Sequence, residues 1–203
     1  MEKDSFKTIE GPSEGIYREK GSKFIGLAFP VSSEKEITEI YEKVKRNYHD
    51  ARHHCYAWRL GPDSTHFRAN DDGEPSNSAG KPILGQIDAA ELSNVLVIIV
   101  RYFGGTLLGV GGLIQAYRNA ARDALNKAVV VDHYLYRIYR LDFNYEKMNV
   151  VMSVIKEMDL DQFGQVFEME CSLKVRLKHS QISKFQSHFQ ADKTIILTDL
   201  GEE

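Results

Sequence analysis

Two segments of the chain combine residue types that could bind a charged ligand or a partner. The first runs from Asn70 to Pro82 (NDDGEPSNSAGKP) and is polar and rich in turn-forming residues. Its neighbouring carboxylates repel one another unless a cation, an arginine or backbone amides lie between them. The segment therefore predicts either a ligand or partner site, or an ordered turn whose side chains cap its own backbone. The candidate site residues in it are Asp71, Asp72, Glu74, Ser76, Ser78, Gly80 and Lys81.

Two familiar loop types do not fit this first segment. A calcium loop of the EF-hand type with Gly73 at its sixth position would begin at Arg68 and end at Ala79, neither of which is a suitable ligand. A phosphate-binding P-loop would need glycine where Pro75 stands and serine or threonine where Pro82 stands.

The second segment, Arg101 to Leu113 (RYFGGTLLGVGGL), joins an apolar strand pattern to a helix pattern. Backbone N–H groups and the helix dipole bind anions in this setting, and glycine permits a close approach of the backbone. The dinucleotide-binding pattern is missing, because Ile114 stands where its third glycine is needed. The alternative is that the glycines only allow tight packing of a strand against a helix. The candidate residues here are Arg101, Tyr102, Gly104, Gly105, Gly109, Gly111, Gly112 and Arg118.

A third region, Lys43 to Trp58, places basic residues among aromatic ones. Aromatic rings beside positive charge are what single-stranded nucleic acid requires. The alternative is that the cations stabilise a helix C-terminus and that the aromatic side chains belong to the core. The possible nucleic-acid contacts from this region and the strand that follows it are Arg46, Arg52, His54 and Arg59.

Metal binding and nucleophilic catalysis find little support in the sequence. Zinc requires three or four converging ligands, whereas His53 and His54 point to opposite faces if they lie on a strand. The chain contains no C-x-x-C pair, and Ser76 and Ser78 lack the G-x-S-x-G setting of a nucleophile. We therefore predict no metal, no cofactor and no catalytic residue.

The totals describe an ordinary globular protein. The chain has 203 residues and a net charge of −3, which argues against coating nucleic acid by bulk charge but leaves room for a local basic patch. No stretch approaches the ~20 apolar residues of a membrane span. The start, Met-Glu-Lys-Asp, has no apolar run of the secretory type, and Cys55 and Cys171 show no pairing pattern. We expect a cytoplasmic protein that does not bind membranes.

The elements that must position these segments follow from apolar periodicity and turn residues. The sequence predicts two domains, the first over residues 1–133 and the second over residues 136–203. In the second domain the order of elements, βαββαβ, is typical of a ferredoxin-like fold. The fold class is therefore α+β. Strands are expected over 23–31, 53–60, 65–69, 94–102, 129–134, 136–143, 163–169, 172–177 and 194–198. Helices are expected from a cap at Ser32 or Ser33 to Tyr48, and over 82–92, 113–127, 150–158 and 182–189.

Four motifs resemble the IMPACT family, whose bacterial members are called YigZ-like proteins. They are SKFIG (22–26), HCYAWR (54–59), DDGEPSNSAGKPIL (71–84) and VRYFGGTLLGVGGLIQAY (100–117), and the likeness covers roughly residues 16 to 130. The resemblance implies a first domain like domain 2 of ribosomal protein S5 and a second domain similar to one of elongation factor G. It also implies a role in translation.

The chain departs from the family pattern at four positions. Asn77-Ser78 replaces Gly-Thr, and Gln115 and Leu107 stand where basic residues are common. Two functions remain open. The first is a regulatory binding protein that contacts RNA, the ribosome or a translation-related protein. The second is an enzyme that acts on a phosphorylated small molecule with a divalent cation held by Asp71, Asp72 and Glu74.

Overall fold

The computed structural model describes residues 4–63 and 65–202, which form a mixed α+β structure of two compact units. The N-terminal unit comprises residues 6–133, and the C-terminal unit comprises residues 4–5 and 134–202. Asp4 belongs to the C-terminal unit because its carboxylate accepts hydrogen bonds from the N–H and hydroxyl groups of Ser180. Residues 1–3, part of the segment from which we expect no secretory signal, lie outside the described residues.

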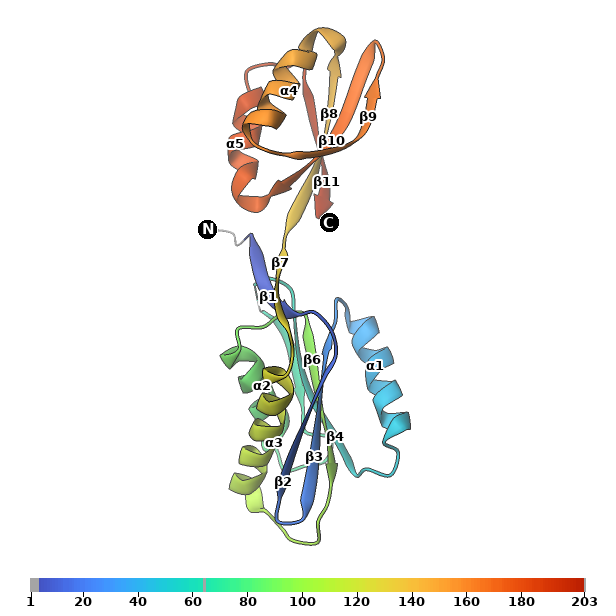
Figure 1. The fold of residues 1–203 in the computed structure, drawn as a ribbon, viewed down its shortest axis with the longest axis vertical. Helices are drawn as coiled ribbons and strands as arrows, with labels where there is room; N and C mark the ends of the chain where they lie inside the picture. The colour runs from blue at the N-terminus through green and yellow to red at the C-terminus, as the bar shows by residue number, and fades with distance from the viewer. Residues whose placement is uncertain (1–3, 64, 203) are drawn as a thin grey trace. The chain divides into compact units, whose positions relative to one another are not determined.

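The N-terminal unit is built on a five-stranded antiparallel sheet (Figure 1). Its strands, in spatial order, are β2 (Ser13–Glu19), β3 (Ser22–Pro30), β6 (Val95–Tyr102), β4 (His53–Leu60) and β5 (His66–Asn70). A separate two-stranded sheet pairs β1 (Ser5–Ile9) with β7 (Val130–Tyr134). Strands β1 and β2 were not predicted, because both are short and carry polar or small residues at several positions.

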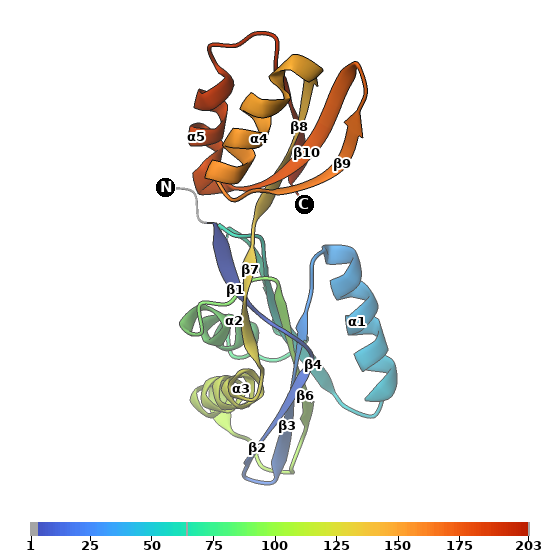
Figure 2. The same ribbon diagram turned by 45° about the horizontal axis from the view of Figure 1, so that its top comes forward.

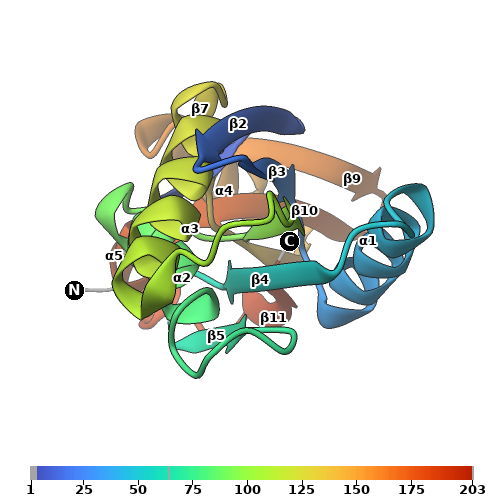
Figure 3. The same ribbon diagram turned by 90° about the horizontal axis from the view of Figure 1, so that it is seen from below.

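Helices cover both faces of the five-stranded sheet, as Figure 3 shows. Helices α2 (Gly80–Ala89) and α3 (Gly109–Asn126) lie on one face, and α1 (Glu34–Asn47) lies on the other. Alternate residues of β6 therefore enter different cores: Val97 and Ile99 pack below α2 and α3, whereas Ile98 and Val100 pack below α1. Burial on both faces explains why this strand is an uninterrupted apolar run.

Helix α1 begins at the predicted serine pair, and the structure selects Ser33 as its cap. The Ser33 hydroxyl accepts a hydrogen bond from the Glu36 N–H at 3.3 Å. The Glu36 carboxylate in turn accepts a hydrogen bond from the Ser32 N–H at 2.8 Å, one residue before the cap. Polar groups at the start of the helix thus satisfy the backbone on both sides of the cap.

The C-terminal unit has the predicted βαββαβ order and a four-stranded antiparallel sheet (Figure 2). In spatial order the strands are β11 (Ile196–Glu202), β8 (Tyr136–Asn144), β10 (Glu170–Lys178) and β9 (Asp161–Phe167). A short 3-10 turn (Tyr145–Lys147) leads into α4 (Met148–Glu157), and α5 (His179–Phe189) precedes β11. Both helices pack on one face of the sheet, over a core that includes Leu141, Leu173 and Phe185.

The structure also bears on the expected absence of a membrane span and on the expected likeness to ribosomal protein S5. None of the helices formed by residues 4–63 and 65–202 combines the length and apolar character needed to cross a membrane. The likeness of the N-terminal unit to domain 2 of ribosomal protein S5 stays a prediction.

Helix α3 crosses β3 so closely that glycine is required at the crossing. A Cβ atom at Gly26 would lie 2.6 Å from the carbonyl oxygen of Ala120. We expect Gly26→Ala to lower the free energy of unfolding of the N-terminal unit by about 1–3 kcal/mol. Urea denaturation followed by the fluorescence of Trp58, the single tryptophan, measures this unit alone.

Gly85→Ala is the matched control for this substitution. Gly85 lies inside α2, and no atom comes within 4 Å of the added Cβ position. The alanine should therefore stabilise the unit by up to about 1 kcal/mol. Equal effects of the two substitutions would contradict the assigned crossing.

Candidate functional site

The acidic segment is a turn organised around Asp71. The Asp71 carboxylate accepts hydrogen bonds from the N–H groups of Asn77, Ala79 and Gly80 at 2.8, 2.9 and 2.8 Å. It therefore caps the start of α2, whose N-cap residue Ala79 has no capping side chain. Asn77 has a φ of 63°, a conformation that glycine and asparagine tolerate best, which accounts for the exchange of Gly for Asn at this position.

Other polar residues of the segment also serve the turn itself. The buried Ser78 hydroxyl donates a hydrogen bond to the Pro75 carbonyl at 2.6 Å. Gly80 is packed so closely that a Cβ atom would lie 2.5 Å from the Asn70 nitrogen. Ser76 is exposed and accepts a hydrogen bond from the Asn77 side chain at 3.2 Å.

Asp72 attaches the turn to β4. Its carboxylate accepts a hydrogen bond from the His54 N–H at 2.6 Å, and its carbonyl oxygen lies 2.8 Å from His53 Nδ1. The strand therefore uses one backbone and one side-chain group to hold the turn beside the end of the sheet.

Glu74 connects the turn to the interior of the N-terminal unit. Its side chain is only 4% exposed and forms an ion pair with Arg101 of β6, whose side chain is 7% exposed. Tyr117 of α3 donates a hydrogen bond to the same carboxylate at 2.7 Å. The Arg101 guanidinium also lies over the rings of Phe24 and Phe103, with its carbon 5.4 and 5.8 Å from the ring centroids.

The hydrogen-bond chain continues from Tyr117 to Cys55. The Cys55 thiol donates to the Tyr117 hydroxyl at 3.3 Å, and burial raises the pKa of both groups. A thiol in this environment stays protonated and behaves as a small core residue rather than as a nucleophile.

The glycine-rich segment divides into two parts. Helix α3 begins at Gly109, four residues before the predicted start at Leu113, so Gly109, Gly111 and Gly112 form its first turn instead of a loop. Gly105 and Gly109 have positive φ values of 86° and 69°. The helix thus starts earlier than the low helix propensity of glycine predicted.

Gly104 lies in the remaining loop and meets the turn between β2 and β3. A Cβ atom at Gly104 would lie 1.9 Å from the carbonyl carbon of Gly21. The Gly104 N–H also donates to the Ser22 hydroxyl at 3.1 Å. This glycine is required for packing, but against the β2–β3 turn and not between a strand and a helix.

The acidic turn and the start of α3 line one cleft of about 480 Å³. The acidic turn contributes Glu74 and Pro75 to its lining. Strand β4 contributes His53, the residue before β4 is Arg52, and β6 contributes Arg101. The sequence pattern pointed to an anion-attracting cleft, but most of the lining is apolar. The apolar lining residues are Phe103, Leu107, Leu108, Val110 and Leu113.

Sequence reasoning did not select these apolar residues. Phe103, Leu107 and Val110 are 48%, 84% and 52% exposed. One signal in the sequence could have identified them: large apolar side chains interrupt the run of glycines. A loop that only binds phosphate does not need such side chains.

Of the predicted partner-binding residues, Glu74, Arg101 and Gly109 line this cleft, and the others lie outside its lining. Lys81 and Arg118 line a different hollow between α2 and α3, together with Asn77, Gln86 and Ile114. The Tyr102 side chain belongs to the α1 side, where its hydroxyl donates to Asp50 at 2.8 Å. Burial, with a further contribution from Asp50, raises the pKa of Tyr102 to about 12.

The four possible nucleic-acid contacts do not form one surface. Arg46 is exposed on α1, whereas Arg52 borders the cleft. His54 is buried, with its Nε2 3.1 Å from the Tyr48 carbonyl oxygen. Arg59 donates to Asp88 at 2.6 Å at the far end of β4.

The three carboxylates of the turn do not converge on a common point. Each faces N–H groups or the arginine described above, and the described part of the chain contains no cluster of three or more histidine, cysteine or acidic side chains suited to a metal.

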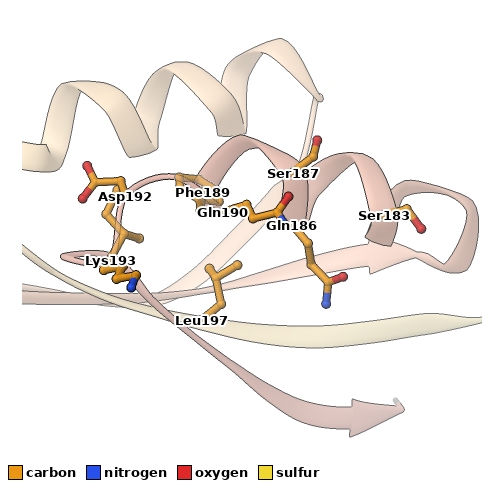
Figure 4. Close-up of a pocket in the computed structure, with 9 residues that line it drawn as sticks. Ser183, Gln186, Ser187, Phe189, Gln190, Asp192, Lys193 and Leu197 are labelled. Atoms are coloured by element: carbon orange, nitrogen blue, oxygen red, sulfur yellow. The ribbon is translucent and has the colours of Figure 1, made fainter.

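The C-terminal unit has a hollow of its own, beside α5 and the loop that leads to β11 (Figure 4). Gln186 and Gln190 of the α5 segment and Lys193 of the loop border it. Asp192, also on its border, forms an ion pair with Lys147 at 2.8 Å. Phe189, Ile195 and Leu197 also line the hollow, so its lining is mixed, and one of its charges already has a partner.

The Glu74–Arg101 pair should dominate the stability of the site. Glu74→Gln keeps the shape of the side chain but leaves the Arg101 charge buried without a counter-ion. We expect the free energy of unfolding, measured by Trp58 fluorescence in urea, to fall by about 3–5 kcal/mol.

An exposed ion pair provides the control. Glu39→Gln removes the carboxylate that lies 4.0 Å from Lys35, where both side chains are largely exposed. This change should cost less than about 0.5 kcal/mol. A comparably small loss for Glu74→Gln would show that the buried pair does not hold the turn in place.

Comparison with known proteins identifies the family. Residues 20–125 match the Impact N-terminal domain. An IMPACT family member of Haemophilus influenzae is 30% identical over 190 residues, which cover 90% of this chain and 92% of that protein. The Escherichia coli family member YigZ is 30% identical over 83% of each chain. The crystal structure of a hypothetical protein aligns with 99% of this chain and all of its own, with a TM-score of 0.70 and 28% identity. With its characteristic segments gathered around one cleft, this chain belongs to the IMPACT family.

Proposed function

We propose that this chain is a translation-associated, regulatory binding protein that acts in the cytoplasm and holds its partner in the cleft between the acidic turn and the start of α3. Membership of the IMPACT family supports the link to translation, because the motifs that identify the family imply such a role. The binding part of the proposal rests on the chemistry of the cleft.

One observation carries the proposal: a rigid polar base lies below an exposed apolar rim. Glu74 forms an ion pair with Arg101 and accepts a hydrogen bond from Tyr117, so the three side chains hold one another at the base of the cleft. Leu107 and Val110 remain exposed at the rim, although exposure of clustered apolar side chains is unfavourable in an isolated protein. Such a combination is typical of the centre of a protein-binding surface.

The residues that line the cleft also favour a protein partner over RNA. RNA would require several cations along a groove, whereas the cations of this cleft, Arg52 and Arg101, include one that is already paired with Glu74. A segment of a ribosomal or other translation-related protein that carries apolar side chains fits the rim better.

The alternative, an enzyme that uses a divalent cation on a phosphorylated small molecule, lacks a supporting observation. It needs Asp71, Asp72 and Glu74 to face a common cation, but they point to separate hydrogen-bond partners. Stabilisation of the chain by magnesium with a nucleotide or sugar phosphate in a thermal-shift screen would favour this alternative.

Val110→Asp tests the cleft. Aspartate in the first turn of α3 favours the helix dipole, so the fold should persist while a charge enters the apolar rim. We expect the wild-type chain to co-sediment with ribosomes and to resist moderate salt, and we expect Val110→Asp to reduce the bound fraction by about tenfold, as loss of a central contact does.

Val129→Asp makes the same substitution at an exposed valine outside the cleft and should leave sedimentation unchanged. Circular dichroism checks that both variants are folded. Failure of the wild-type chain to sediment, or equal losses in the two variants, would refute the ribosome-bound form of the proposal.

A further inference from the structure

The sheet of the C-terminal unit has one face that no helix of this unit covers. Leu141, Leu173 and Val175 point toward α4 and α5, so their neighbours along β8 and β10 point to the opposite face. Figure 2 shows both helices on the same side of this sheet. We call the other side the open face. It goes beyond the cleft considered above and belongs to a different unit.

Cations gather on the two central strands of the open face. The register places Lys174 opposite Arg140, Arg176 opposite Ile138 and Lys178 opposite Tyr136. Carboxylates are also present on this side of the sheet: Asp142 of β8 lies 2.7 Å from Arg140, Asp161 of β9 lies 3.8 Å from Arg176, and Glu170 stands at the start of β10. The residues that form the open face of β8 and β10 are Tyr136, Ile138, Arg140, Asp142, Asn144, Glu170, Ser172, Lys174, Arg176 and Lys178.

The two lysines of this face have no carboxylate partner within 4.0 Å among residues 4–63 and 65–202. The face is therefore locally positive, although the whole chain has a net charge of −3. Such a local patch, rather than the net charge of the chain, sets the electrostatic potential that a ligand meets at this face.

Aromatic rings lie beside these cations. The Arg176 guanidinium carbon is 5.5 Å from the Tyr136 ring centroid and 5.8 Å from that of Phe163 on β9. Lys178 Nζ lies 5.0 Å from the Tyr134 ring centroid. Phe163 of β9 lies opposite Lys174 in the register, and Lys174 lies opposite Arg140 of β8, so an aromatic ring stands beside two cations in one row of the sheet.

We propose that the open face binds a single strand of nucleic acid. Rings and guanidinium planes on an open four-stranded sheet provide surfaces on which unpaired bases stack, and lysines between them reach the phosphates. The same side chains would bind RNA or DNA, since both present bases and phosphates. Recognition is tolerant of sequence because every base has a stacking face.

A second copy of the chain is a poorer occupant of this face. In a symmetric dimer the same patch meets itself, so Lys174, Lys178 and their neighbours would face an identical set of cations. Like charges placed opposite one another oppose such an interface. A polyanion removes this repulsion.

The test uses the full chain and fluorescein-labelled oligouridylate and oligothymidylate of about 12 nucleotides, long enough for a small sheet. Fluorescence anisotropy should show binding to at least one of them, which identifies the sugar that the face prefers. A duplex of the same length should compete poorly, because its bases are already stacked. Raising the salt from about 50 to 200 mM should weaken binding.

Two variants address the two parts of the surface. Phe163→Ala removes a stacking ring and should weaken binding by about tenfold. Lys174→Glu should weaken binding further and should lower the slope of log affinity against log salt by about 0.7, the value for one lost phosphate contact on a single strand. Lys156→Glu, which makes the same charge change on exposed α4, should bind like the wild-type chain.

Four outcomes overturn the proposal. They are no binding by the wild-type chain, equal binding of duplex and single strands, equal losses in Lys174→Glu and Lys156→Glu, and a dimer that is disrupted by Phe163→Ala without any nucleic-acid binding. Thermal melting of each variant separates loss of contact from loss of fold. Because cleft variants leave this face intact, the result does not depend on the function proposed for the cleft.

Discussion

The buried ion pair between Glu74 and Arg101 is the constraint on which the N-terminal unit depends. Burying two charges is costly, and the cost is offset only if each finds a close partner and further hydrogen bonds. Glu74 obtains these from Arg101 and Tyr117, and Arg101 gains the faces of two aromatic rings. One carboxylate thereby joins a surface turn, a central strand and the helix that packs on the sheet.

This arrangement changes which groups of the acidic turn and the glycine-rich segment are available to a partner. Asp71 and Asp72 accept hydrogen bonds from backbone N–H groups, and Glu74 pairs with an arginine, so all three carboxylates hold the acidic turn in place. What remains available at the surface is the apolar rim contributed by Phe103, Leu107 and Val110. A polar sequence motif has produced a surface whose exposed chemistry is largely apolar.

The two units also differ in how helices cover their sheets. In the N-terminal unit, helices cover both faces, and β6 is apolar from Val95 to Val100. In the C-terminal unit, both helices pack on one face, and the strands alternate between apolar and charged residues. The alternation Lys174, Val175, Arg176, Leu177 and Lys178 records this one-sided burial directly in the sequence.

The sequence by itself determined most of the elements, the βαββαβ order and the family, because apolar periodicity and long motifs are local properties. It placed β4, β6 and the helices within a few residues, but it treated Gly109 as a loop residue, since glycine disfavours helix when tertiary contacts are unknown. Only the tertiary structure decided that Glu74 meets Arg101, 27 residues away, and that Lys81 and Arg118 face a separate hollow. Partners of this kind depend on strand order and register, which bring side chains together across the sheet and are not encoded in the spacing of any one segment.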